Sequence, residues 1–200
     1  MISKERLRKW VLTRREKDKK TTPLHATTFV LTCAYVWVRS EEIRDKKVSL
    51  GFLVDCRVRL DPPIPATYFG NCITACIITA ETCEIMGEDG VTVAVEAFSE
   101  TIRELDSGVL RGMEEVFSMI NPKERQLLTA IAGSTRFGVY ETDFGWGRPI
   151  KVEPPSIDIT GAISLAESRD GSGGVEFGLA LNNLKMEVFA SRFANGLKSI

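Results

Sequence analysis

The chain has 200 residues, of which 44% are hydrophobic, with 26 basic and 27 acidic side chains and one histidine. A chain of this length can bury the core of one domain, removing about 70% of its unfolded surface from water. Its near-zero net charge gives no general affinity for nucleic acid, and its longest apolar run, at residues 73–80, is too short to cross a bilayer.

The five cysteines are an odd number, which disfavours a disulfide framework, and the sequence shows no pattern of a secretory leader. We therefore expect free thiols, a reducing compartment and a cytoplasmic location. Cys72 and Cys76 lie four residues apart, but no second pair of cysteines or histidines completes a tetrahedral metal site. We expect buried thiols there and no metal ion.

Two helices are predicted at the start of the chain. Residues 4–20 are rich in lysine and arginine, and Leu7 and Val11 belong to an apolar stripe at helical spacing. Acidic residues interrupt the basic ones, which favours a solvated helix face over a site for a polyanion. The second helix is predicted from Pro23, which suits a first helical turn, and its apolar stripe extends to Trp37.

The clearest strand pattern covers residues 48–60. Every even-numbered side chain in it is apolar, while Arg57 and Arg59 project from the opposite face. Three prolines between residues 61 and 65 end this strand, because proline cannot donate to a strand ladder. A second strand is expected at residues 71–79.

The rest of the chain mixes both element types. Helices are expected at residues 91–105 and 109–120, divided at Gly108. The further strands are expected at residues 127–132, 138–142, 157–167 and 175–181. A glycine-rich turn at residues 170–174 joins the last two strands as a hairpin. A closing helix, at about residues 184–193, is expected to end in a left-handed cap near Gly196. This order predicts an α/β fold of the α+β kind, a mixed sheet flanked by helices.

Two strings, Tyr68-Phe69-Gly70-Asn71-Cys72 and Asp143-Phe144-Gly145-Trp146-Gly147, stand among similar blocks over nearly the whole chain. They resemble signatures of the plant BAHD acyltransferases, also called HXXXD-type acyltransferases. The first string is similar to the branch that malonylates anthocyanin, flavonoid or phenolic glucosides. The resemblance implies a chloramphenicol acetyltransferase-like domain that forms the C-terminal half of such an enzyme. Residues 1–22 would be a remnant of the crossover helix and linker, and residues 23–200 the domain core.

The resemblance also implies a chemistry. The co-substrate would be malonyl-CoA or another acyl-CoA, with no tightly bound cofactor, and the acceptor would be a glycosylated phenolic. In the family, the general base is the histidine of a His-x-x-x-Asp motif that lies upstream of both strings. The single histidine here, His25, is followed by Ala-Thr-Thr-Phe. We expect a structural or surface imidazole there and assign no catalytic residue.

The string at residues 143–147 is expected to be structural. The resemblance implies a salt bridge from Asp143 to Arg57 or Arg59, and the strand pattern, with Arg59 preferred, makes a bidentate contact natural. Gly145 and Gly147 can adopt backbone angles closed to other residues, so that Phe144 and Trp146 pack on opposite sides of the turn.

Two interpretations are open for residues 68–72. Tyr68 and Phe69 are core residues where a strand begins, or they line a substrate pocket together with Asn71. Coenzyme A candidates are Thr27 and Thr28, in the first turns of the second helix, where a helix N-terminus suits phosphates. Ordinary helix-start polarity explains these threonines nearly as well. Ser134 and Arg136 are further coenzyme candidates by position alone.

Three functions fit these observations. The chain is a domain that lines the coenzyme channel and acceptor pocket of a malonyltransferase-like enzyme, or a non-catalytic family member that binds coenzyme A or another protein. A free-standing oligomeric acyltransferase ranks last, because it would need His25 as its base. We also expect an exposed apolar face, where a partner domain would pack and where the chain could self-associate.

Overall fold

The computed structural model describes residues 4–40, 46–111 and 128–200. Its centre is a five-stranded mixed sheet with the strand order β2-β1-β3-β4-β5. The strands are β1 (Lys47–Asp55), β2 (Ile73–Glu81), β3 (Leu128–Gly133), β4 (Ile163–Glu167) and β5 (Val175–Gly178). The central strands β1, β3 and β4 run parallel, whereas β2 and β5 are antiparallel to their neighbours. The predicted mixed sheet is confirmed.

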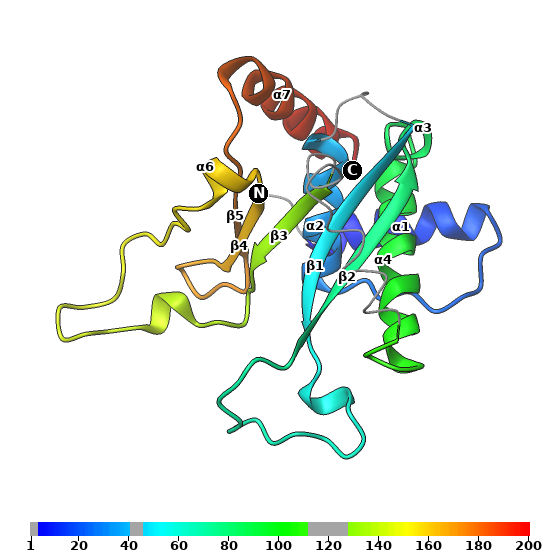
Figure 1. The fold of residues 1–200 in the computed structure, drawn as a ribbon. Helices are drawn as coiled ribbons and strands as arrows, with labels where there is room; N and C mark the ends of the chain where they lie inside the picture. The colour runs from blue at the N-terminus through cyan, green and yellow to red at the C-terminus, as the bar shows by residue number, and fades with distance from the viewer. Residues whose placement is uncertain (1–3, 41–45, 112–127) are drawn as a thin grey trace.

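Helices flank this sheet, as Figure 1 shows. The long helices are α1 (Lys4–Lys17), α2 (Thr28–Ser40), α4 (Gly90–Asp106) and α7 (Asn183–Ser199), and the short ones are α3 (Thr82–Ile85) and α6 (Ile157–Thr160). Helices α2 and α4 pack on each other, α4 packs on β2, and α1 packs on both α2 and α4. Within the described residues, every helix is too short or too polar to span a bilayer.

The main core lies between β1 and the helices. The inward face of β1 buries Val48, Leu50 and Phe52, as its alternating pattern predicts. The Phe52 ring packs against Phe98 of α4, with centroids 5.4 Å apart, and against Phe29 of α2, at 5.9 Å. One aromatic cluster therefore joins the sheet to two helices.

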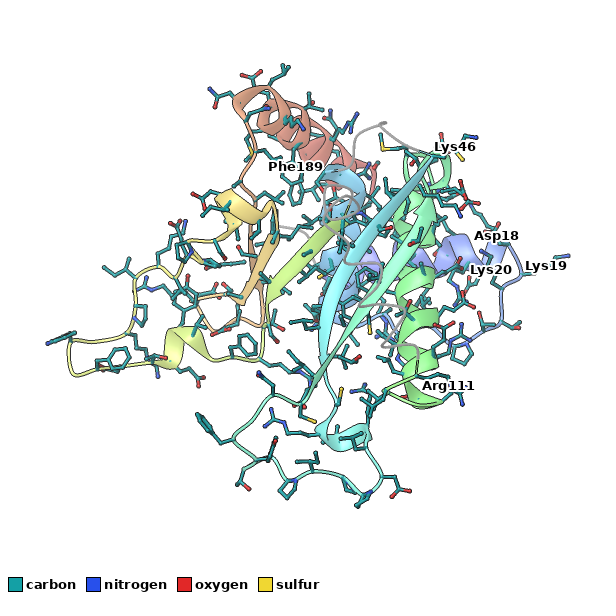
Figure 2. All side chains as sticks on the ribbon, viewed as in Figure 1. Asp18, Lys19, Lys20, Lys46, Arg111 and Phe189 are labelled. Carbon is teal, nitrogen blue, oxygen red and sulfur yellow. The ribbon has the colours of Figure 1, made fainter. Side chains whose placement is uncertain are left out.

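A partly buried charge network fixes α1 and the polar linker after it. The Arg15 side chain, only 7% exposed, donates from Nε to Glu96 of α4 at 2.9 Å and from Nη2 to the backbone oxygen of Thr22 at 2.8 Å. Lys20, labelled beyond α1 in Figure 2, donates to the other oxygen of Glu96 at 2.7 Å. Residues 4–22 are therefore fastened to the domain through α4.

Helix α7 is anchored to α2 and to β5. The Tyr35 hydroxyl donates to the Phe193 backbone oxygen at 2.7 Å, and Phe189, labelled in Figure 2, contacts the ring of Phe177. The predicted left-handed cap at Gly196 is wrong, because α7 continues to Ser199. A Cβ at Gly196 would lie 2.6 Å from the Tyr35 hydroxyl, so close packing of α7 on α2 favours glycine there.

Two predicted boundaries are displaced. The second helix begins at Thr28 rather than Pro23, because the Thr27 hydroxyl accepts from the Val30 amide at 3.3 Å and caps that turn. The strand predicted at residues 48–60 ends at Asp55, whose carboxylate accepts from the Arg57 amide at 3.0 Å. This contact turns the chain into a 3₁₀ helix at Arg57–Arg59.

Two predicted strands are partly or wholly wrong. Residues 138–142 contain a 3₁₀ helix, η3 (Val139–Glu141), and residues 157–160 form α6 before the chain enters β4. Gly161 ends α6 with φ of +67°. The hairpin at residues 170–174 is confirmed by the antiparallel pairing of β4 and β5. Most of the helix predicted at residues 109–120 lies outside the described residues.

Candidate functional site

The predicted site residues lie on segments that begin at one edge of the sheet. Because β1, β3 and β4 are parallel, their carboxyl ends share one edge. Two long loops, residues 56–72 and 134–162, leave the body of the domain there (Figure 1). The start of α2 faces the same end, since Phe29 contacts Phe52 near the end of β1.

The loop at residues 56–72 presents its aromatic side chains to solvent. Phe69 is fully exposed and Tyr68 is about half exposed, so neither is a core residue of this domain, and the strand-entrance interpretation is wrong for them. Asn71 is also exposed. Arg57 shapes the loop, since its Nη1 donates to the backbone oxygens of Ala66 at 3.2 Å and Tyr68 at 3.4 Å.

Arg57 also forms an ion pair with Asp55. Its Nε lies 3.0 Å from the Asp55 carboxylate, and these hydrogen bonds hold the pKa of Asp55 below its ordinary value. Arg59 reaches the Asp55 backbone oxygen at 3.5 Å. Both arginines therefore serve the turn at the end of β1.

Asp143 organises its own loop. One carboxylate oxygen accepts from the amides of Gly145 at 2.7 Å and Gly147 at 3.0 Å, and both glycines have φ above +90°. The expected ion pair with Arg57 or Arg59 is not formed among the described residues, because these groups are satisfied locally. Phe144 and Trp146 are 82% and 93% exposed, and their loop projects from the domain (Figure 1).

The residues predicted to contact coenzyme A are at least partly accessible to solvent. Thr27 and Arg136 are exposed, while Thr28 and Ser134 are half-buried. The Ser134 hydroxyl accepts from the Arg136 amide at 3.2 Å and shapes the turn after β3. His25 precedes α2 rather than lying inside it, and its backbone amide donates to the Ser99 hydroxyl at 3.0 Å.

An open cleft, of about 1350 Å³, was not predicted. It lies between the segment after η3, the hairpin β4–β5 and α7, and its walls include Phe137, Tyr140, Phe177 and Phe189. The Tyr140 hydroxyl donates to Glu176 at 2.7 Å, and this bond raises the tyrosine pKa. No local motif signals such a cleft, because its lining residues come from several elements between residues 132 and 189, and the hollow exists only once these elements are folded against one another.

The described residues contain no cluster of three histidine, cysteine or acidic side chains placed to hold a metal ion. Apart from the carboxylates of Asp55 and Asp143, which accept hydrogen bonds from nearby amides, the polar groups at the carboxyl edge are threonine and serine hydroxyls, arginines and backbone amides. Such groups suit the binding of anions and hydroxyl compounds.

Comparisons with known proteins identify relatives that are about twice as long. The chain is 44% identical to phenolic glucoside malonyltransferase 2 of Arabidopsis thaliana, over 92% of this chain and 43% of that protein. It is 40% identical to malonyl-CoA:anthocyanidin 5-O-glucoside-6''-O-malonyltransferase of the same plant, with the same two coverages. The chain thus spans less than half the length of the curated relatives it matches.

Solved structures share the fold. The crystal structure of vinorine synthase matches with a TM-score of 0.64 and 20% identity, over 89% of this chain and 43% of that one. TRI101 of F. sporotrichioides, complexed with coenzyme A and T-2, matches with a TM-score of 0.60 and 16% identity, over 84% and 44%. The fold is therefore chloramphenicol acetyltransferase-like, as predicted. The model of the Transferase family covers residues 1–195, and with these relatives it shows that the chain belongs to that family, the BAHD acyltransferases.

Proposed function

We propose that this chain is one domain of a cytoplasmic, coenzyme A-dependent O-acyltransferase. Its donor is malonyl-CoA or another acyl-CoA, and its acceptor is a phenolic, flavonoid or anthocyanidin glucoside. The names of the similar proteins support this substrate class. The one histidine, His25, lacks the family motif, so the general base is supplied by a second domain.

The exposed aromatic side chains carry this proposal. Phe69, Phe144 and Trp146 lie on two loops that leave the same end of the sheet, and solvent reaches most of each ring. Burying one such side chain is worth roughly 1.5–3 kcal/mol, and soluble domains seldom leave several uncovered unless they form an interface. A second domain, of the length by which the relatives exceed this chain, would cover them.

The polar groups at this end would then line the channel between the domains. Thr27 and Thr28 stand at the start of α2, where free backbone amides and the helix dipole favour phosphate. Ser134 and Arg136 follow β3 and add a hydroxyl and a cation. Asn71 offers its amide to the acceptor.

Complementation tests this function. The chain is assayed with malonyl-CoA and a phenolic glucoside, alone and mixed with the N-terminal half of a malonyltransferase that carries the His-x-x-x-Asp motif. We expect turnover only in the mixture, and the variant His25→Ala should be as active there as the parent chain. Turnover by the chain alone would contradict the assignment of the base to a second domain.

A non-catalytic role is the second candidate, and the absence of the motif around His25 favours it. In that case the chain binds coenzyme A or a protein without turnover in any mixture.

The variant Asp143→Ala tests whether Asp143 has a structural or a chemical role. We expect it to loosen the loop at residues 143–147 and to lower coenzyme affinity in the complemented enzyme. Loss of turnover alone, with melting temperature and affinity retained, would assign Asp143 a chemical role.

A further inference from the structure

Two cysteines face each other at the base of the loop at residues 56–72. The β1–β2 ladder ends with Asp55 opposite Ile73, and one step further the Cys56 amide donates to the Cys72 backbone oxygen at 2.9 Å. The Cys56 oxygen accepts from the Arg59 and Leu60 amides, so one hydrogen bond rather than a reciprocal pair joins the two cysteines. Because the bonded nitrogen and oxygen lie within two covalent bonds of their own Cα atoms, this bond places the two Cα atoms about 5–6.5 Å apart. A disulfide spans Cα separations of about 4.4–6.8 Å, so this pair is within reach.

The other described thiols are poorly placed for either of these two. Cys76 lies opposite Phe52 in the ladder, four residues along β2 from Cys72, which corresponds to about 13 Å. Burial raises the pKa of its thiol first, and Cys56 raises it further. Cys83 lies in α3, beyond the far end of β2. Cys33 is fully buried in α2, and burial raises the pKa of its thiol.

We propose that Cys56 and Cys72 form a redox-active pair that glutathione disulfide, or another low-molecular-weight disulfide, oxidises to an intramolecular disulfide. This inference concerns a modification site and does not depend on the proposed acyl transfer. Cys72 is half-buried and Cys56 is buried, so the first reaction occurs at Cys72. The pKa of Cys56 is raised, by burial first and then by Cys72, which suits the thiol that reacts second.

The exchange balances in two steps. The Cys72 thiolate attacks one sulfur of glutathione disulfide, forming a mixed disulfide and releasing one glutathione thiolate. Cys56 then loses its proton and attacks the Cys72 sulfur, releasing the second glutathione. The two thiols lose two electrons and two protons in total, and one glutathione disulfide is reduced to two glutathiones.

Oxidation would fasten the ends of the loop that carries Tyr68 and Phe69. The loop is now held by main-chain contacts and by the Arg57 guanidinium. Without a covalent link, the two ends of the loop can move apart when the end of the β1–β2 ladder frays. A disulfide between them would prevent this movement. Tyr68 and Phe69 would then lie on a loop whose two ends are covalently joined.

Peptide mapping tests the pairing in the chain as it exists. The chain is equilibrated in glutathione buffers of increasing oxidised fraction, alkylated and digested with trypsin without reduction. Cleavage separates residues 48–57, which contain Cys56, from residues 60–103, which contain Cys72. We expect these peptides to be joined, at a mass two hydrogens below their sum. The mapping is repeated with a double variant, Cys76→Ala and Cys83→Ser. In that variant Cys72 is the one thiol in the peptide of residues 60–103.

Two single variants check the order of reaction. Cys56→Ala should accumulate a glutathione adduct on Cys72, because no thiol remains to displace it. Cys72→Ala should leave Cys56 unmodified under the same conditions. A persistent adduct on Cys72 in the parent chain, or a link that survives in the Cys72→Ala variant, would overturn the proposal.

Discussion

Gly133 ends β3 directly before Ser134, and replacing it with alanine tests how tightly β3 and β4 are joined. Its φ is +99°, and a Cβ there would lie 2.3 Å from the backbone oxygen of Leu165, its partner in β4. Gly145 is a matched control. Its φ is +96°, but a Cβ there would meet nothing within 4 Å.

The two substitutions share one cost and differ in another. An alanine forced to positive φ costs roughly 1–2 kcal/mol at either site. At Gly133 the clash with the backbone adds about 1–3 kcal/mol of overpacking. It also disrupts the last pair of a ladder with three registered pairs, and each lost hydrogen bond costs about 0.5–1.5 kcal/mol. We expect Gly133→Ala to be about 2–4 kcal/mol more destabilising than Gly145→Ala.

Urea unfolding of both variants and the parent chain, followed by far-UV circular dichroism, measures this difference. Equal slopes against urea would show that the comparison reports native-state stability. A difference below about 0.5 kcal/mol, the usual effect of a neutral surface change, would refute the reasoning, because it would mean that β3 and β4 do not approach as closely as the structure has them.

Three further predictions concern other parts of the domain. Gly196→Ala gains about 1 kcal/mol of helix propensity but places a methyl group against the Tyr35 hydroxyl, so we expect a net loss of about 1 kcal/mol, and a raised melting temperature would contradict it. Arg15→Met leaves Glu96 with Lys20 alone, and because Glu96 is partly solvated we expect a loss of about 2 kcal/mol, measured by urea unfolding. If Arg15→Met caused no loss in a chain that already carries Glu96→Gln, the cost of Arg15→Met would lie in the ion pair. For Asp170, hydrogen bonds from serines of its turn hold the pKa at about 2, against about 3.9 in the unfolded chain. The carboxylate therefore favours the folded turn above about pH 4, and this contribution fades as the pH falls through about 2. An NMR titration with a midpoint at the ordinary aspartate value would contradict it.

Side-chain periodicity predicted the parts of the fold where burial decides structure. β1 is recognisable because its inward side chains meet two helices, and α4 because one helical face is continuously apolar. The pattern continued to Leu60, but the strand did not. A single side-chain contact, from Asp55 to the Arg57 amide, turned the chain, and periodicity carries no information about such a contact.

Tertiary packing and a side-chain cap explain the errors near helix ends. Asn195-Gly196 has the composition of a left-handed cap, yet Gly196 lies inside α7, where Tyr35 and Arg39 leave no room for a side chain. The composition suggested a left-handed cap, whereas glycine at this position allows α7 to pack closely on Tyr35 of α2. Likewise, Pro23 suggested a helix start that the Thr27 hydroxyl provides one turn later.

Both motifs were recognisable as sequence strings, but their positions relative to each other were not predicted. In the structure they lie on loops that leave one edge of the sheet. The predicted arginine partner of Asp143 is not found in this domain. The Asp143 carboxylate accepts instead from the amides of Gly145 and Gly147, which are close to it in sequence. The cleft beside Tyr140 depends on how the elements between residues 132 and 189 pack on one another, for which no local pattern exists.

The strand order has a consequence for handling the chain as an isolated polypeptide. β2, nine residues long, is an outer strand among those described, so one row of its main-chain donors and acceptors has no strand beside it in the sheet. Such an edge is a template for pairing with a strand of another molecule. Intermolecular strand pairing would therefore compete with any partner domain during refolding. A lysine in place of Ile77 or Thr79, which are not core residues, is a rational way to keep the chain soluble for the assays above.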